Sequence, residues 1–167
     1  MHNGLKVDNN NINALCNIGY ILIIMNEPEK ALEILFRAHT ITPNDIPTLT
    51  NIGDTYIDLK DYDKGVFYLK KAAELNELNE GTDIIYNDLG WAFHMSGKYF
   101  EALESYNIAI EHLDSDELAA TAYSNRGALK VNFLNDLESG IEDLKKACSL
   151  GDFDAKNQLY KLGLFYS

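Results

Sequence analysis

A glycine recurs inside segments that otherwise have the residue spacing of a helix, and this feature constrains the fold more than any other. It stands at Gly19, Gly53, Gly90 and Gly127, so successive intervals are 34, 37 and 37 residues. A glycine inside a helix costs about 1 kcal/mol relative to alanine. Its repetition therefore indicates a repeated packing requirement, in which two helices approach closely.

Each glycine segment is followed by a second helical stretch in which two small residues stand seven positions apart. This separation places both side chains on one helical face. Small side chains allow close packing, so we expect each glycine segment to pack against the stretch that follows it. The small residues are Ala31 and Ala38, Gly65 and Ala72, Ala102 and Ala109, and Gly140 and Ala147.

This pattern resembles the tetratricopeptide repeat, a helix-turn-helix unit. The resemblance covers residues 12–154 and implies an all-α fold, a right-handed α-solenoid superhelix of about four such units with a C-terminal capping helix. The residues that carry it are Leu15, Ile18, Gly19, Leu22, Ala31, Leu35, Ala38 and Pro43 in repeat 1, and Tyr86, Leu89, Gly90, Phe93, Ala102, Tyr106 and Ala109 in repeat 3.

The repeat frame divides the chain into a leader at residues 1–11, four repeats at residues 12–45, 46–79, 83–116 and 120–154, and a capping helix at residues 155–167. The longer intervals predict one additional helical turn ahead of the glycine in the later repeats. The last stretch places Gly163 at the glycine position of a fifth first helix.

That fifth helix has no second helix after it, which leaves three alternatives. Its apolar end, Leu164, Phe165 and Tyr166, docks on a second copy of the chain and forms a homodimer. Alternatively, it folds back on Ala147 and Leu150 and leaves a monomer. The third alternative is that the chain is one piece of a longer array.

Within repeat 3, Leu89, Gly90 and Phe93 share one helical face, which we expect to look toward Ala102 and Tyr106 of the second helix. A side chain at the glycine position would push the two helices apart. We therefore interpret this glycine as architectural.

Repeat 4 departs from the pattern because it has Arg126 and Lys130 where repeat 1 has isoleucine and leucine. A cation on a buried face needs a partner. The candidates in the repeat frame are Glu142 and Asp143, so we expect a structural ion pair here.

The charge balance limits the classes of partner. The chain has 26 acidic and 14 basic residues and a net charge of −12, which disfavours nucleic acid and anionic membrane surfaces. Its longest apolar run, residues 20–25, is too short to cross a bilayer. The two cysteines, Cys16 and Cys148, lie far apart in the sequence, so we expect a reduced, cytoplasmic chain.

The sequence contains none of the stronger catalytic motifs, such as a Gly-x-Ser-x-Gly turn, a phosphate-binding glycine loop or a His-Glu-x-x-His helix. The histidines lie in different repeats and none has a second ligand one helical turn away, which disfavours a metal site. We therefore predict a non-enzymatic protein with no cofactor and no bound metal.

The family resemblance implies that the first helices line a concave groove that holds a peptide or a helix of a partner. The residues predicted to face it are Asn17 and Tyr20 in repeat 1, Asn51 and Asp54 in repeat 2, Asn87, Asp88, Trp91 and His94 in repeat 3, and Asn125 in repeat 4.

Short polar residues stand two positions before every glycine, as Asn17, Asn51, Asp88 and Asn125. An amide both donates and accepts hydrogen bonds, so such a ladder suits an extended peptide backbone. The alternative is that these amides bond only within the array. Trp91 is the candidate for an interface anchor, with a half-buried structural role as its alternative.

Some members of the family clamp acidic chaperone tails with basic groove residues, and those basic residues are missing at the predicted groove positions. We therefore expect a neutral or basic partner segment. The favoured function is a protein-binding module that acts as an adaptor, scaffold or assembly factor. The alternatives are a secretion-type chaperone of the same family, and a regulatory subunit or fragment of a larger protein.

Overall fold

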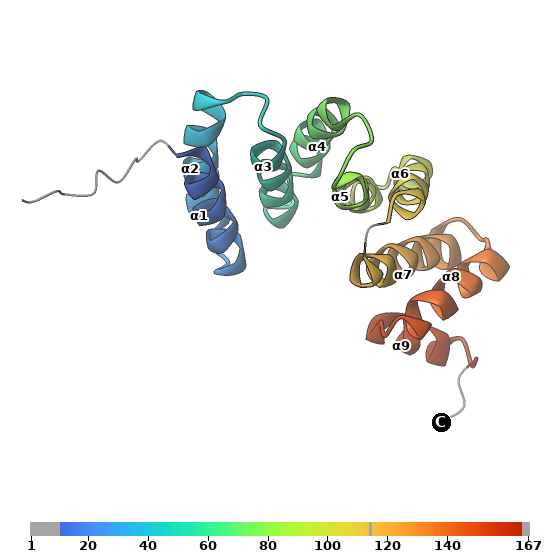
Figure 1. The fold of residues 1–167 in the computed structure, drawn as a ribbon. Coiled ribbons are helices and arrows are strands. Elements are labelled where there is room, and N and C mark those ends of the chain that lie inside the picture. The colour runs from blue at the N-terminus through green and yellow to red at the C-terminus, as the bar shows by residue number, and fades with distance from the viewer. Residues whose placement is uncertain (1–10, 114, 165–167) are drawn as a thin grey trace, which may run out of the picture. The chain divides into compact units, whose positions relative to one another are not determined.

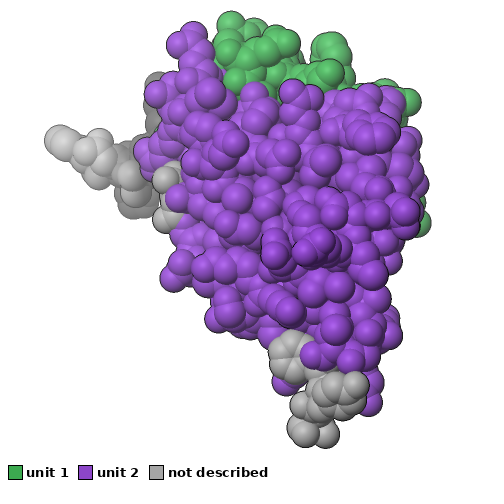
Figure 2. Space-filling view, turned by 90° about the vertical axis from the view of Figure 1, so that its right-hand side faces the viewer, with its two compact units in different colours: residues 1–75 green, residues 76–167 purple. Residues whose placement is uncertain are grey.

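The computed structural model describes residues 11–113 and 115–164, which form nine α-helices and no strand (Figure 1). The chain divides into two compact units, residues 1–75 and residues 76–167, coloured separately in Figure 2. Each unit is considered by itself below. The predicted leader, residues 1–11, lies outside the described residues except for Asn11.

The first unit contains α1 (Ile12–Ile24), α2 (Pro28–Ile41), α3 (Ile46–Asp58) and α4 (Tyr62–Asn76), whose last residue belongs to the second unit. Two of these helices have an N-cap side chain that accepts a hydrogen bond from the backbone of the first turn: Asn11 caps α1 and Asp45 caps α3. Asn26 and Lys60 adopt left-handed backbone angles in the turns that end α1 and α3. These local signals set the helix-turn-helix pattern.

The second unit contains α5 (Thr82–Met95), α6 (Tyr99–Glu111), α7 (Asp116–Phe133), α8 (Leu137–Ser149) and α9 (Phe153–Lys161). The predicted extra turn is present in α7, which begins eleven residues before its glycine, whereas α3 begins seven residues before its own. The prediction is wrong for repeat 3, because its additional residues lie in the segment before α5. There Glu77, Leu78 and Gly81 have positive φ angles and do not continue a helix.

The recurring glycine marks a close contact between paired helices, as predicted. A methyl group built on Gly90 would lie 2.6 Å from Cδ1 of Tyr106 on α6, and one on Gly19 would lie 2.5 Å from Cδ2 of Leu35 on α2. Such distances are far below van der Waals contact, so a larger residue would force the helices apart. Both facing side chains are fully buried. The architectural role of the glycine is confirmed.

The predicted ion pair of repeat 4 is also confirmed, with Asp143 as the acidic partner. The guanidinium of Arg126 donates to both carboxylate oxygens, at 2.8 and 2.7 Å, and Lys130 Nζ donates to Oδ2 at 2.8 Å. Arg126 also donates to Asn107 on α6 at 2.8 Å. Glu142, the other candidate, is exposed. These bonds satisfy two largely buried cations.

The last helix, α9, packs on α8, where Ala155 and Leu159 join a buried cluster with Leu144 and Ala147. Leu164 is exposed, and the rest of the predicted apolar end lies outside the described residues.

The expectation that Gly163 occupies the glycine position of a fifth first helix is wrong. Gly163 lies beyond the end of α9 with a φ of 73°, and nothing lies within 4 Å of the place where its Cβ would be. Its left-handed backbone ends the helix, which is a common role of glycine at this position.

The capping residues reveal the true register of α9. Asp152 caps α9 and accepts a hydrogen bond from Ser124, just as Asp45 caps α3 and accepts one from Cys16. The glycine of α3, Gly53, lies eight residues after the cap Asp45. The residue eight positions after the cap Asp152 is Tyr160, which therefore occupies the corresponding position of α9. The position that holds a glycine in the other first helices is therefore a tyrosine in α9.

Candidate protein-binding faces

The first helix of each repeat contacts the first helix of the next within a unit: α1 lies against α3, α5 against α7, and α7 against α9. A row of first helices thus presents one face in each unit, which we call its first-helix face. The predicted groove residues of the first unit are Asn17, Tyr20, Asn51 and Asp54, and those of the second unit are Asn87, Asp88, Trp91, His94 and Asn125.

In the first unit, the residues on α1 are open to solvent and those on α3 are partly buried. Asn17 is exposed, and Tyr20 has 57% of its surface exposed. Asn51 and Asp54 are half-buried. This part of the face combines an exposed phenol with short polar groups.

A buried thiol connects α1 to α3 beneath this face. Cys16 Sγ lies 2.9 Å from Thr48 Oγ1 and 3.7 Å from Asp45 Oδ2. Burial raises the pKa of the Cys16 thiol, with the charge of Asp45 adding to the effect. The equivalent bond between Ser124 and the cap of α9 shows that this position, three residues before the glycine, links consecutive first helices.

In the second unit, the predicted polar residues form a hydrogen-bonded string. Asn125 Nδ2 on α7 donates to Asn87 Oδ1 on α5 at 3.2 Å, and Asn87 Nδ2 donates to Asp88 Oδ1 at 3.3 Å. Asn87 is only 6% exposed, so it lies beneath the face and supports its neighbours. Asn125 and Asp88 are half-buried. The amide of Asn125 thus makes a bond within the array.

Asp88 is the charged end of this string, and its surroundings disfavour ionisation. Burial raises the pKa of Asp88 to about 7, while the hydrogen bond from Asn87 acts in the opposite direction. The hydroxyl of Tyr106 on α6 is buried and has no hydrogen-bond partner among the described residues. Its burial and the charge of Asp88 both raise the pKa of Tyr106.

Trp91 and His94 belong to a cluster of rings that also includes Tyr99 and Phe133. The centroid of the His94 ring lies 5.6 Å from the ring centroid of Trp91, 6.0 Å from that of Tyr99 and 4.9 Å from that of Phe133. Burial lowers the pKa of His94, which favours its neutral form. Trp91 keeps 38% of its surface exposed, so its indole both packs in the cluster and remains open to a ligand.

The sequence prediction missed two residues of this cluster, Tyr99 and Phe133. Phe133 lies at the end of α7, six residues after the glycine, and 46% of its surface is exposed. The helices α1, α3 and α5 end five residues after their glycine, so Phe133 lies one residue past the end that the repeat frame gives a first helix. The repeat pattern therefore did not single it out.

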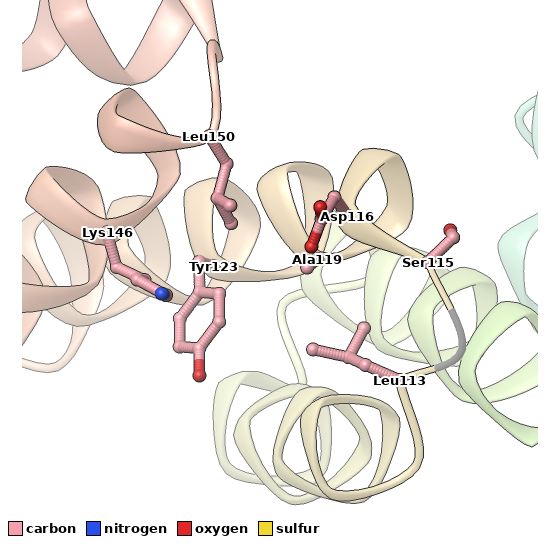
Figure 3. Close-up of a pocket in the computed structure, with 7 residues that line it drawn as sticks. All are labelled: Leu113, Ser115, Asp116, Ala119, Tyr123, Lys146 and Leu150. Atoms are coloured by element: carbon pink, nitrogen blue, oxygen red, sulfur yellow. The ribbon is translucent and has the colours of Figure 1, made fainter.

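A separate cavity of about 420 Å³ lies in the second unit, at the end of α6, the first turns of α7 and the end of α8 (Figure 3). None of the predicted groove residues lines it. Its walls mix apolar, hydroxyl and charged groups: Leu113, Ser115, Asp116, Ala119, Tyr123, Lys146 and Leu150.

No cluster of three or more metal-ligating side chains occurs in the part of the chain that the structure describes. Across the same residues, no helix has the length and apolar character required to cross a bilayer.

Two tetratricopeptide repeat family models match the chain, one over residues 12–45 and the other over residues 45–115. Human tetratricopeptide repeat protein 21A is 29% identical over 136 residues, which are 80% of this chain and 10% of that protein. The human protein O-mannosyl-transferase TMTC3 is 27% identical over 154 residues, which are 92% of this chain and 16% of that protein. The chain therefore spans only a small part of the length of these relatives.

The solved structure of MamA superimposes with a TM-score of 0.73 at 21% identity, covering 91% of this chain and 85% of that one. At this identity the likeness concerns the fold alone. It confirms the predicted fold class, an all-α solenoid of helix-turn-helix repeats.

Proposed function

The chain belongs to the tetratricopeptide repeat family, whose repeats serve as protein-interaction modules, and we propose that it binds a peptide or helical segment of a partner on its first-helix faces. In this proposal the module is non-enzymatic and acts as an adaptor, scaffold or assembly factor. It needs no cofactor, because recognition depends on side-chain contacts alone.

The observation that carries the proposal is the hydrogen-bonded string on the second unit beside an exposed indole. Asn125, Asn87 and Asp88 hold one another in place across α5 and α7, so the polar part of the face is ordered before a ligand arrives. Preordered groups lose less conformational entropy on binding. Trp91 is open beside them, and tryptophan is a common interface anchor.

The first unit supports the same function with a different set of groups. Asn17 and Tyr20 are exposed on α1, and each can donate and accept hydrogen bonds. The phenol of Tyr20 adds an apolar ring with a polar tip, a combination that suits protein interfaces.

The partner segment is neutral or basic in this proposal. None of the nine predicted groove residues is a lysine or arginine, two are aspartates, and the whole chain carries a net charge of −12. Like charges across an interface weaken association, so an acidic segment is disfavoured. The unpaired Cys16 and Cys148 support action in the reducing cytoplasm. The monomer and the homodimer through α9 both remain compatible with this function.

Affinity capture from native lysate, followed by mass spectrometry, tests the proposal. The bait carrying Asn51→Ala and Trp91→Ala removes one amide and one anchor from the first-helix faces. The matched control carries Glu33→Ala and Glu104→Ala, which are exposed on the second helices α2 and α6.

We expect both variants to melt within a few degrees of the parent, because all four side chains are at least partly open to solvent. The partners captured by the parent should be lost with the first variant and retained with the control. Retention of the same partners by the folded first variant would contradict the proposal and indicate another surface.

A further inference from the structure

One stripe of α5 combines apolar side chains with a carboxylate. Ile84, Asp88 and Trp91 follow one another at steps of four and three residues, which places them on the same side of the helix. Ile84 and Trp91 are both exposed, and Asp88 is half-buried between them. The stripe therefore presents a carboxyl group within an apolar setting.

The carboxylate of Asp88 is positioned by its neighbours and is not neutralised by them. It accepts a hydrogen bond from Asn87, which is itself fixed by Asn125 of α7. The neighbouring helix α7 has two basic residues, Arg126 and Lys130, and both of them bind Asp143 instead of Asp88. A cation supplied by a ligand would therefore stabilise the ionised form of this carboxyl group.

We propose that Asp88 and Trp91 anchor one arginine side chain of the partner segment, with the adjacent apolar residue of that segment packed on Ile84. The guanidinium binds the carboxylate and stacks on the indole, two interactions that arginine makes together better than lysine. This inference rests on the proposed function and specifies the chemistry of the partner.

Two blocked tripeptides test the site, acetyl-Leu-Arg-Leu-amide and the same peptide with citrulline in place of arginine. Citrulline has nearly the same shape and no charge. Trp91 is the single tryptophan of the chain, so its fluorescence reports binding at this position directly. We expect the parent to bind the arginine peptide about tenfold more tightly than the citrulline peptide, since charge-assisted hydrogen bonds are the stronger ones.

Asp88→Asn should reduce that preference to about one, because the variant keeps the shape and loses the charge. Glu104→Gln removes the same charge from the exposed surface of α6 and should keep the tenfold preference. Equal binding of both peptides by the parent would overturn the arginine site and leave the proposed function standing. If neither peptide changed the Trp91 signal, the first-helix face of this unit would lose its assigned role as well.

Discussion

The helix pairs α5/α6 and α7/α8 both pack closely at a glycine, but the side chains beside that glycine are apolar in the first pair and ionic in the second. In the first pair, Gly90 receives the ring of a fully buried tyrosine. In the second pair, Gly127 lies so close to α8 that a methyl group there would be 2.9 Å from the carbonyl oxygen of Gly140. The space beside it holds two cations and one carboxylate.

We infer from this difference that the small residues set the distance between the helices, and that the neighbouring positions accept either apolar or ionic side chains. The ionic arrangement is stable because each cation has more than one acceptor: Arg126 donates to Asp143 and Asn107, and Lys130 donates to Asp143 and Ser139. A buried ion pair tolerates little loss, since one missing partner leaves a charge uncompensated. The two pairs should therefore respond differently to substitution.

The largest effect should come from removing the carboxylate of the ionic pair. Asp143→Ala leaves Arg126 and Lys130 in largely buried positions without their shared partner. We expect the free energy of unfolding to fall by about 3–5 kcal/mol, measured by urea denaturation. A loss below about 1 kcal/mol, the typical value for an exposed pair, would show that the network contributes little.

The next largest effect should come from overfilling the apolar pair. Gly90→Leu drives a side chain into the ring of Tyr106 and should cost about 3 kcal/mol in thermal or urea unfolding. Glu104→Leu, which adds a similar side chain at an exposed site on α6, is the control and should change stability little. Equal melting of the two variants would refute the packing role of the glycine. Asn26→Ala is a poor control, because Asn26 has a φ of 58° that alanine adopts at a cost.

A smaller effect should follow from Asp88, the half-buried carboxyl group of the apolar pair. Because the pKa of Asp88 is raised to about 7 from its ordinary value of 3.8, the folded state holds a proton that the unfolded state has released between these values. Its contribution to stability is therefore fully present below about pH 4 and is lost as the pH rises through 7.

Asp88→Asn should consequently match the parent at about pH 3.5 and exceed it at pH 8 by about 1–2 kcal/mol, since solvent screens the half-buried group. Urea unfolding of both proteins at the two pH values measures this change. A stability difference that does not depend on pH would contradict the burial of this carboxylate.

The smallest effect should come from converting the ionic pair into an apolar one. The triple variant Arg126→Met, Lys130→Leu and Asp143→Leu replaces the network with apolar side chains of similar length. Such exchanges are often neutral or stabilising, so we expect a change within about 1 kcal/mol of the parent. A loss as large as that of Asp143→Ala would show that the ionic network itself, and not its completeness, stabilises this pair.

The sequence predicts the frame well because the frame depends on local spacing. The glycine and the small residues fix which helices pair, and a cation at an apolar position requires an acid nearby, which is why Asp143 was among two candidates. The register of α9 was not predictable from spacing alone. Gly163 follows Leu159 by four residues, just as Gly19 follows Leu15. Only the positive φ angle of Gly163 reveals that it ends the helix.

The candidate site was predictable in its residues and not in their partners. Counting from the glycine finds Asp88, Trp91 and Asn125. The bond between Asn125 and Asn87 depends on the distance between α5 and α7, and the unpaired hydroxyl of Tyr106 depends on how its ring fills the space beside Gly90. Neither distance is encoded in a pattern of residue types.

Amide hydrogen exchange with a captured partner segment tests whether partners bind to the first helices. Binding should slow exchange in first helices, namely α1 and α3 in the first unit and α5 and α7 in the second, while α2, α6 and α8 keep their free rates. Protection confined to α2, α6 and α8 would place the partner on the second helices and refute binding to the first-helix faces.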